Sequence, residues 1–378
     1  MYVDKNDFYD IVSKTTSITN GESIHLKFGK YAIEAIGKGA PNAIYSLCTL
    51  SNARDYTADK TIILDGKTLG RAIKGFGKNP SKTIYLSFTK SGETQEVLEL
   101  SRYNTKIQIP FLAASGEEED PFKMPPIQGS LTIDGFEFRN AFSSLQKFVG
   151  GDNGTLQIAI HNDIKNKNVR MVSTDGHRMM VKTINAACDE TPPFGDKEGY
   201  LYIIPSMFNR YVKGLSGDHI IVGFAGESLV TIGNESTELY IAKSDASFPP
   251  YQAVIPKSAK DDVLIKTGRM SLINALKQLP LSSEVTRYSQ IIMEFEHNKC
   301  RIFREDENMA CESKIAYTSP SNNVESGFKI SFNAKYLISI LEDLKTDNIL
   351  IVMKDSEAGI TVTEEADTKV LLMPIKIV

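Results

Sequence analysis

The residues of this sequence that could do chemistry stand together at 173–178, which reads Ser-Thr-Asp-Gly-His-Arg. Asp175 and His177 are the residue types of a general acid–base pair. No nucleophile or set of metal ligands stands near them at a spacing typical of an active site. Asp, Ser and Thr side chains also hydrogen-bond their own backbone in turns. We therefore interpret the run as a turn network or a recognition site, and keep catalysis by Asp175 and His177 as the alternative.

The segments on either side of this run predict a β-hairpin that carries it. Residues 169–172 alternate as a strand does, and residues 177–184 read as the return strand. Asp175-Gly176 indicates a two-residue type I′ turn, in which both central residues need a positive φ. The polar run is therefore expected at the tip of an apolar hairpin.

Length and composition indicate a globular protein of several domains. The chain has 378 residues, which is too long for one ordinary hydrophobic core, so two or three domains are expected. Its apolar content of 41% and charged content of 24% are those of globular proteins. The net charge of −4 excludes a protein that is basic throughout. Contact with a nucleic acid would require positive charge gathered on one surface.

The N-terminus and the cysteines predict a cytoplasmic protein. The first ten residues are polar and acidic, unlike a signal peptide, and no apolar window is long enough to span a membrane. No cofactor or metal site is expected. The cysteines are scattered without a CxxC pair and are expected to be reduced: Cys48, Cys188, Cys300 and Cys311.

A faint internal repeat recurs at a period of roughly 130 residues. Apolar residues spaced i, i+3, i+4 and i+7 form one stripe of an amphipathic helix, and such stripes begin at Leu69, Phe208 and Leu337. A short polar break and an apolar strand follow each stripe. The three strands are expected at 84–88, 220–224 and 349–353.

A second amphipathic stretch comes earlier in each third, around Phe8, Phe138 and Met270. Each third therefore reads as a strand, a helix, several strands, a second helix and more strands. Two helices on one face of an antiparallel sheet make an α+β unit. The sequence predicts an α+β protein built from three such units.

Shifts in composition mark the expected boundaries between these units. Residues 117–126 are acidic and rich in proline, which is typical of a linker or an edge loop. Prolines cluster again over 247–257. The predicted domains are 1–126, 127–256 and 257–378.

Positive charge gathers on two of the three later helices. The segment 65–78 carries four cations against Asp65, and 208–215 carries two cations and no acid, whereas 335–345 is neutral. For any single helix an ordinary solvated face is the simpler explanation. Together with the repeat, the pattern favours a shared basic surface that would attract duplex DNA without reading its sequence. The candidate DNA-facing residues are Lys67, Arg71, Lys74, Arg210 and Lys213, with Arg287 on a loop.

Four short motifs occur in order along the second and third predicted domains. They are STDGHRM at 173–179, SFPPYQAVIP at 247–256, the helix entry Asn333-x-x-Tyr336-Leu337, and LLMPIKIV at 371–378. They resemble the TDGHRL hairpin, the FPDYxxVxP segment, the third-domain helix entry and the MPMRL ending of bacterial DNA polymerase III β subunits, the sliding clamps. The first predicted domain resembles that family only by its architecture and by the stretch 109–122.

The resemblance implies three-domain crescents that dimerise head to tail into a ring, with helices around the hole and sheets on the rim. Such a homodimer encircles duplex DNA and tethers the replicative DNA polymerase, and it is not an enzyme. The implied partners are double-stranded DNA, the polymerase, an ATP-dependent clamp loader and other proteins with a clamp-binding motif. The chain has no GxxxxGK[ST] loop, which is consistent with an ATPase that resides elsewhere.

The resemblance also implies a hydrophobic pocket for short linear peptides between the second and third domains. Met and branched aliphatic side chains would form an adaptable apolar groove, and the polar tip would orient the peptide. The pocket residues carried over by motif are Thr174, Gly176, His177, Arg178, Met179, Pro249, Val254, Asn333, Tyr336, Leu371, Met373, Pro374 and Ile375.

The sequence departs from the family pattern at several of these positions. Ala253 stands where the family often has Arg, Met179 replaces Leu, and Pro250 replaces Asp. An intact pocket with an altered peptide preference is therefore expected, in a divergent clamp. The alternative is a clamp-like scaffold that binds peptides without encircling DNA.

Overall fold

The computed structural model divides the chain into two compact units, which are described one at a time. The first unit comprises Met1–Arg139, Ala186–Lys197 and Ser206–Asp245, and the second comprises Asn140–Asn185, Glu198–Pro205 and Ala246–Val378. The structure describes residues 1–19, 23–39, 44–50, 59–77, 82–92, 94–113, 120–149, 158–163, 168–188, 200–203, 215, 217–226, 229–242, 248–256, 259–280, 289–306, 309–321, 323–363 and 368–377. These units do not follow the expected boundaries near 126 and 257, and the division into three domains stays a prediction.

The first unit contains two antiparallel sheets. The four-stranded sheet has the order β1 (Tyr2–Asp4), β6 (Thr83–Ser91), β7 (Gln95–Arg102), β8 (Thr105–Pro110). The nine-stranded sheet has the order β13 (Ala186–Cys188), β9 (Ile127–Asp134), β15 (His219–Ala225), β16 (Leu229–Asn234), β17 (Thr237–Ala242), β4 (Ile44–Leu50), β3 (Ile33–Gly39), β2 (Ser23–Phe28), β5 (Lys60–Asp65).

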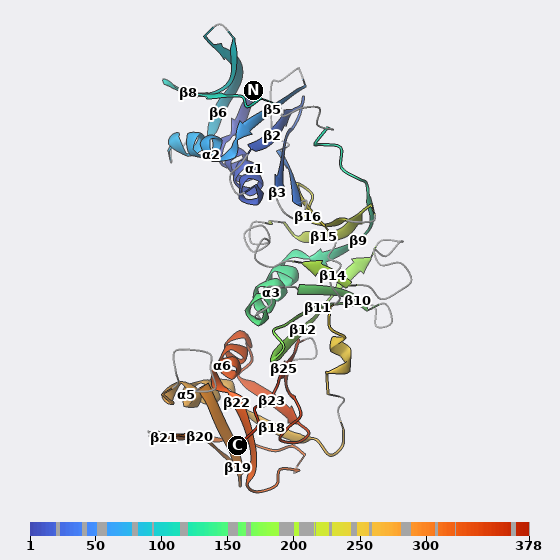
Figure 1. The fold of residues 1–378 in the computed structure, drawn as a ribbon, viewed down its shortest axis with the longest axis vertical. Coiled ribbons are helices and arrows are strands. Elements are labelled where there is room, and N and C mark those ends of the chain that lie inside the picture. Colours follow the sequence, from blue (N-terminus) through green and yellow to red (C-terminus); the bar gives the residue numbers. More distant parts are fainter. Residues whose placement is uncertain are drawn as a thin grey trace. The chain divides into compact units, whose positions relative to one another are not determined.

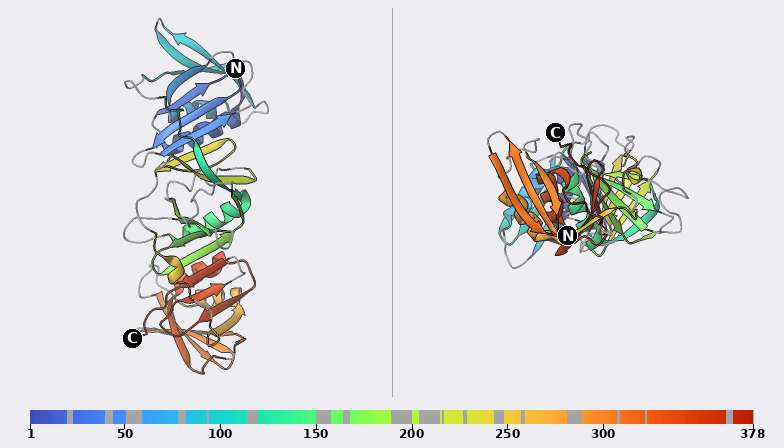
Figure 2. Two further views of the ribbon diagram at one scale, coloured as in Figure 1. Left: turned by 90° about the vertical axis from the view of Figure 1, so that its right-hand side faces the viewer. Right: turned by 90° about the horizontal axis from the view of Figure 1, so that it is seen from below.

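Two helices of the first unit, α1 (Lys5–Ile18) and α2 (Gly66–Gly75), pack against each other (Figure 1). In the left view of Figure 2, blue strands lie across the two helices. The predicted apolar stripes form the contact, because Phe8 of α1 and Leu69 and Ile73 of α2 are buried in one cluster with strand residues of both sheets. The helix predicted over 65–78 is shorter because Asp65 caps its start and Gly77, with φ of +65°, follows its end.

The second unit repeats this plan. Its eight-stranded sheet has the order β14 (Tyr200–Ile203), β10 (Ile158–Asp163), β11 (Asn168–Thr174), β12 (Arg178–Ile184), β25 (Thr368–Leu372), β24 (Ile360–Thr363), β23 (Asn348–Met353), β18 (Val263–Gly268). Its four-stranded sheet has the order β21 (Met309–Ala316), β20 (Lys299–Asp306), β19 (Gln290–Glu296), β22 (Phe328–Asn333).

Helices α5 (Arg269–Gln278) and α6 (Ala334–Asp343) of the second unit pack on each other and on strands of both sheets (Figure 1). Asn333 caps α6, with its side-chain oxygen accepting from the Lys335 amide at 3.0 Å. A further helix, α3 (Gly135–Leu145), begins in the first unit, and its last residues belong with the 3-10 helix η1 (Gln146–Phe148) to the second.

The predicted α+β class is confirmed by this arrangement of helices on antiparallel sheets. The amphipathic stretches around Phe8, Phe138 and Met270 are α1, α3 and α5. The strands expected at 84–88, 220–224 and 349–353 are β6, β15 and β23. The helix expected from Phe208 lies outside the described residues. None of the helices in the described residues is long and apolar enough to span a membrane.

Candidate functional site

The hairpin of β11 and β12 forms as predicted, but its turn differs. The strands pair antiparallel as far as Thr174 and Met179. Four residues therefore connect the last pair, rather than two. Within the connection only Gly176 has a positive φ, of +86°. The predicted two-residue type I′ turn is wrong because the Asp175 side chain, rather than a second left-handed residue, closes the turn.

The carboxylate of Asp175 organises this turn. Its Oδ1 atom accepts hydrogen bonds from the backbone amides of His177 at 3.0 Å and Arg178 at 2.9 Å. Its Oδ2 atom accepts from Arg178 Nε at 2.8 Å. Asp175 thus binds the backbone and a guanidinium, and these contacts do not involve the His177 imidazole. The geometry favours the turn network over the acid–base pair.

Arg178 ties the hairpin to two other segments of the second unit. Its guanidinium donates to Ser339 Oγ of α6 at 2.9 Å and to the Lys147 carbonyl of η1 at 2.7 Å. It also stacks on the rings of Phe148 and Tyr336, at 4.9 and 4.6 Å from their centroids. The Arg178 side chain is 11% exposed, so its charged group is committed to contacts within the protein. Arg178 therefore serves mainly to hold the hairpin against η1 and α6, and its charge is little exposed to solvent.

The C-terminal strand lies directly beside the hairpin. In β25, Leu371 pairs with Met179 of β12. Beyond the strand, the Met373 amide donates to the His177 carbonyl at 2.9 Å, and the Ile375 amide donates to the Ser331 carbonyl of β22 at 2.8 Å. The C-terminal segment therefore runs from the hairpin tip toward the four-stranded sheet.

A buried apolar cluster joins this pair of strands to the segment 248–255. Its members are Ala159, Val172, Met179, Val181, Tyr251 and Leu371, with Phe248 and Ile255 packed against them. Tyr251 begins the short 3-10 helix η3 (Tyr251–Ala253) and is 1% exposed. Pro249 and Val254 flank it and remain exposed.

The predicted pocket residues all lie in the second unit, but they differ in burial and in the contacts that they form. Met179 and Leu371 share the buried cluster, and the His177 ring lies 5.8 Å from that of Tyr336. Thr174 is held in the turn, where its Oγ1 atom donates to the Arg178 carbonyl at 2.9 Å. Asn333 is occupied as the cap of α6. Pro374 and Ile375 are half-buried, and Met373 is exposed. That these residues bind a peptide stays a prediction.

Several residues at this site were not predicted from the sequence. Lys147, Phe148 and Ser339 all contact Arg178. Lys147 also forms an ion pair of 2.6 Å with Asp343 of α6. Ser339 lies 161 residues from Arg178, and no motif or periodicity connects such positions.

The candidate DNA-facing residues on α2 lie on its exposed side, opposite buried Leu69 and Ile73. Arg71 donates to Thr68 Oγ1 at 3.2 Å. The Lys74 ammonium lies 5.0 Å from the Tyr9 ring, and its hydrogen bond with the Tyr9 hydroxyl lowers the pKa of that phenol. Lys67 is also exposed. Arg210, Lys213 and Arg287 lie outside the described residues.

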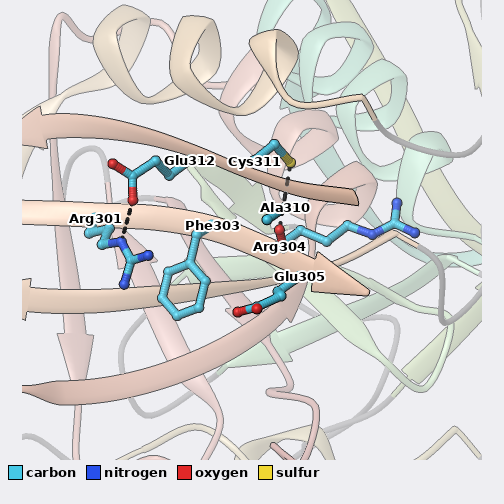
Figure 3. Close-up of a pocket in the computed structure, with 7 residues that line it drawn as sticks. All are labelled: Arg301, Phe303, Arg304, Glu305, Ala310, Cys311 and Glu312. Carbon is cyan, nitrogen blue, oxygen red and sulfur yellow. Dashed lines mark hydrogen bonds and ion pairs between the residues drawn. The ribbon is translucent and has the colours of Figure 1, made fainter. Parts of the chain in front are cut away.

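A separate open pocket of about 220 Å³ lies on the β20–β21 hairpin (Figure 3). Arg301 is one of the residues that line it. The Arg301 guanidinium donates to Glu312 at 2.6 Å and to Glu294 at 3.3 Å, and it stacks on the Phe303 ring. A hydrogen bond from Lys329, with Arg301 adding to it, holds the pKa of the Glu294 carboxyl below its ordinary value. The predicted site residues do not line this pocket.

The cysteines with described side chains are the free thiols of Cys300 and Cys311. Burial raises the pKa of the Cys300 thiol to about 12, which leaves it unreactive at neutral pH. The side chains of Cys48 and Cys188 are not among those described. Within the described residues, no three His, Cys, Asp or Glu side chains gather closely enough to hold a metal ion.

Comparison with known proteins finds similar sequences and similar folds. A family model described as the DNA polymerase III beta subunit, C-terminal domain, matches residues 252–376. The beta sliding clamp of Pseudomonas putida is 24% identical over 229 residues, which are 57% of this chain and 56% of that protein. The chain therefore matches little more than half the length of this relative.

The fold extends the likeness to the whole chain. A DNA polymerase sliding clamp from Pseudomonas aeruginosa, solved with a ligand, matches with a TM-score of 0.81 at 14% identity, covering 100% of this chain and 99% of that one. The Helicobacter pylori beta clamp, solved with a DNA ligase peptide, matches with a TM-score of 0.76 at 17% identity and full coverage of both chains. Together, the family match, the curated relatives and the fold support the assignment of this chain, as a divergent member, to the bacterial DNA polymerase III beta subunit family.

Proposed function

We propose that this protein is a DNA sliding clamp, a replication processivity factor that acts in the bacterial cytoplasm as a ring-shaped homodimer around duplex DNA. The observation that carries the proposal is the meeting of four motif segments in the second unit: the hairpin tip, the segment 249–255, the start of α6 and the C-terminal strand. These segments are far apart in the sequence, and three of them lie against the hairpin.

The proposed task of this site is to hold short peptides of the replicative DNA polymerase and of other proteins with a clamp-binding motif. Met179 and Leu371 supply an apolar base, and Val254 and Met373 are apolar side chains left 57% and 42% exposed beside it. Apolar side chains of a peptide would gain most of their binding energy by covering such groups. The DNA ligase peptide of the Helicobacter pylori clamp supports peptides as the ligand class.

The proposed DNA-facing surface is basic and non-selective. Lys67, Arg71 and Lys74 present charge from the exposed side of α2. Such cations attract phosphates of any sequence, and their contacts weaken with salt. Arg210, Lys213 and Arg287 complete the proposed surface.

An ATP-dependent clamp loader would open and close the ring. The matches indicate no enzymatic family, and we propose no catalytic role.

The free edges of the two four-stranded sheets support head-to-tail dimerisation. Among the described strands, β8 pairs only with β7, and β21 pairs only with β20. An unpaired edge strand offers a row of backbone donors and acceptors to another chain. We propose that β8 of one copy approaches β21 of the next, which would cover the pocket beside Arg301 (Figure 3).

Light scattering after gel filtration tests the ring. One chain has a mass of 41.9 kDa, and the proposal predicts a particle of twice that mass. Lys106→Pro, which introduces a second proline into β8, should shift the particle to the mass of one chain, because position 106 alternates with the residues that bond β7 and its amide faces the free edge. A monomer at all concentrations would contradict the ring. It would favour the alternative scaffold, which binds peptides but is not retained on closed DNA.

A further inference from the structure

A buried histidine lies behind the proposed peptide site. His161 of β10 is 0% exposed, and its Nδ1 atom lies 2.5 Å from the Tyr251 hydroxyl, with which it shares a hydrogen bond. The two rings meet edge to face, with centroids 5.7 Å apart and planes at 80°. β10 is held in the sheet between β11 and β14, so the imidazole is fixed to a rigid element.

The Tyr251 ring is surrounded by apolar side chains, including those of Met179 and Leu371. A phenol hydroxyl buried in such surroundings costs free energy unless it forms a hydrogen bond. Ala159 and His161 share one face of β10, because side chains alternate along a strand. An apolar residue at position 161 would fill space but would not hold the hydroxyl.

The buried Tyr251 ring in turn anchors the exposed turn around it. The Tyr251 amide donates to the Pro249 carbonyl at 2.7 Å, and the Val254 amide donates to the Tyr251 carbonyl at 3.2 Å. Pro249 and Val254 therefore keep their places relative to the Tyr251 backbone. A displacement of the Tyr251 side chain would move both residues with it.

We propose that His161 is a positioning residue of the peptide site, holding Tyr251 so that Pro249 and Val254 stand at a fixed distance from Met179 and Leu371. This inference rests on the proposed peptide-binding function. The ligand it concerns is a large apolar peptide side chain, because the flanking exposed group is Val254 and the base of the site is apolar. The width available to that side chain depends on the hydrogen bond of His161 with Tyr251.

The test uses three variants of the full chain: His161→Phe, Tyr251→Phe and the double variant. The probe is a fluorescent synthetic peptide ending in Leu-Phe, with an Ala-Ala version to measure non-specific binding. Each single variant breaks the hydrogen bond and leaves one polar group behind, so affinity should fall about five- to tenfold. The double variant removes both groups and should return to within about twofold of the unmodified protein.

Hydrogen exchange supplies a readout that does not depend on the peptide. The amides of Ala253 and Val254 should exchange faster in the single variants and return toward normal in the double variant. Ile302→Val is the matched control, since Ile302 is 0% exposed in β20 of the same unit and belongs to the other sheet. This control should lower thermal stability without changing peptide affinity or exchange at 253–254.

Unchanged affinity and unchanged exchange in His161→Phe would overturn the role of His161. That role would also be overturned if Ile302→Val weakens peptide binding as much, because the effect would then be loss of stability alone. If the unmodified protein does not bind the probe, the proposed peptide site fails. The positioning of Tyr251 by His161 would then still be judged by the exchange at 253–254.

Discussion

The hairpin tip of the second unit and the basic side of α2 in the first both present polar residues, but they are held in opposite ways. At the tip, Asp175 and Arg178 are 8% and 11% exposed and form short, directional contacts with several segments. On α2, Lys67, Arg71 and Lys74 are exposed, and the contacts of Arg71 and Lys74 are with Thr68 and Tyr9.

This difference matches two kinds of binding. Buried, directional contacts fix a surface in one shape, which is what a site selective for particular peptides requires. Solvated cations on a helix keep their freedom and interact with phosphates regardless of sequence. The comparison predicts that damage at the tip costs folding and selectivity, whereas damage on α2 changes only a salt-dependent attraction.

The largest effect is expected for Arg178→Ala. It removes the partner of the nearly buried Asp175 carboxylate and the links to η1 and α6, so the second unit should lose about 3 kcal/mol of stability. Urea unfolding measures the loss in the free energy of unfolding. Hydrogen exchange of the amides in β11 and β12, under native conditions, shows that the loss is in the hairpin. Arg71→Ala is the matched control and should stay within about 0.5 kcal/mol. Equal losses in the two variants would erase the contrast between the regions.

Gly359→Ala should weaken peptide binding about fivefold with little loss of stability. A Cβ atom there would stand 3.0 Å from Met373 Sδ and 3.1 Å from Leu371 Cδ1, so these flexible side chain ends must shift within the proposed site. Fluorescence anisotropy with the Leu-Phe peptide measures the change. Gly70→Ala in α2 is the control: its Cβ would meet Tyr9 only at 3.9 Å, and it should leave peptide binding intact. Unaltered affinity in Gly359→Ala would argue against Met373 and Leu371 as peptide contacts.

The caps of α2 and α6 should respond differently to acid. A hydrogen bond with the Thr68 side chain, together with its amide and nearby cations, holds the pKa of Asp65 below its ordinary 3.8. The stability from this cap is therefore complete above the unfolded pKa and is lost as the pH falls through the lower folded pKa. Asn333, which caps α6, does not titrate.

Hydrogen exchange in α2 and α6 between pH 5 and pH 2 tests this contrast. We expect α2 to lose about 1 kcal/mol of local stability below pH 3.8 while the cap of α6 contributes no such change. Asp65→Asn should remove this part of the pH dependence of α2, since asparagine also caps helices. A pH response of α2 that survives Asp65→Asn would show that the cap is not its source.

The smallest effects are expected on DNA attraction. Lys67→Ala, Arg71→Ala and Lys74→Ala should each reduce the slope of log affinity against log salt by about one at most. Binding of a short duplex at several salt concentrations measures the slope, and peptide affinity should remain the same. A variant that alters the preference for one DNA sequence over another would contradict a non-selective surface.

Local pattern was enough to predict most elements of the fold. The apolar stripe from Leu69 gave α2, and that from Leu337 gave α6, because burying one face of a helix imposes its period on the sequence. The two strands of the hairpin followed from their alternation. The motif residues Met179 and Leu371 do lie together, as the resemblance required.

Contacts between distant side chains could not be predicted in this way. Asp175 was expected at a central position of a type I′ turn. In the structure its carboxylate instead accepts hydrogen bonds from the backbone amides of His177 and Arg178, which fixes a different turn. Arg178 was expected as a wall of the pocket, yet it lies between Ser339 and Lys147 because tertiary packing brings those partners to it. The pairing of His161 with Tyr251 has no signature in the sequence for the same reason.

Retention on DNA tests the encircling ring most directly. The protein, loaded by a clamp loader onto a nicked circular duplex, is washed at high salt, and the circle is then cut by a restriction enzyme. We predict that the protein stays on the circle through the wash and leaves within minutes once the DNA has ends. Loss during the wash, or equal retention on circular and cut DNA, would contradict a clamp that holds DNA by enclosing it.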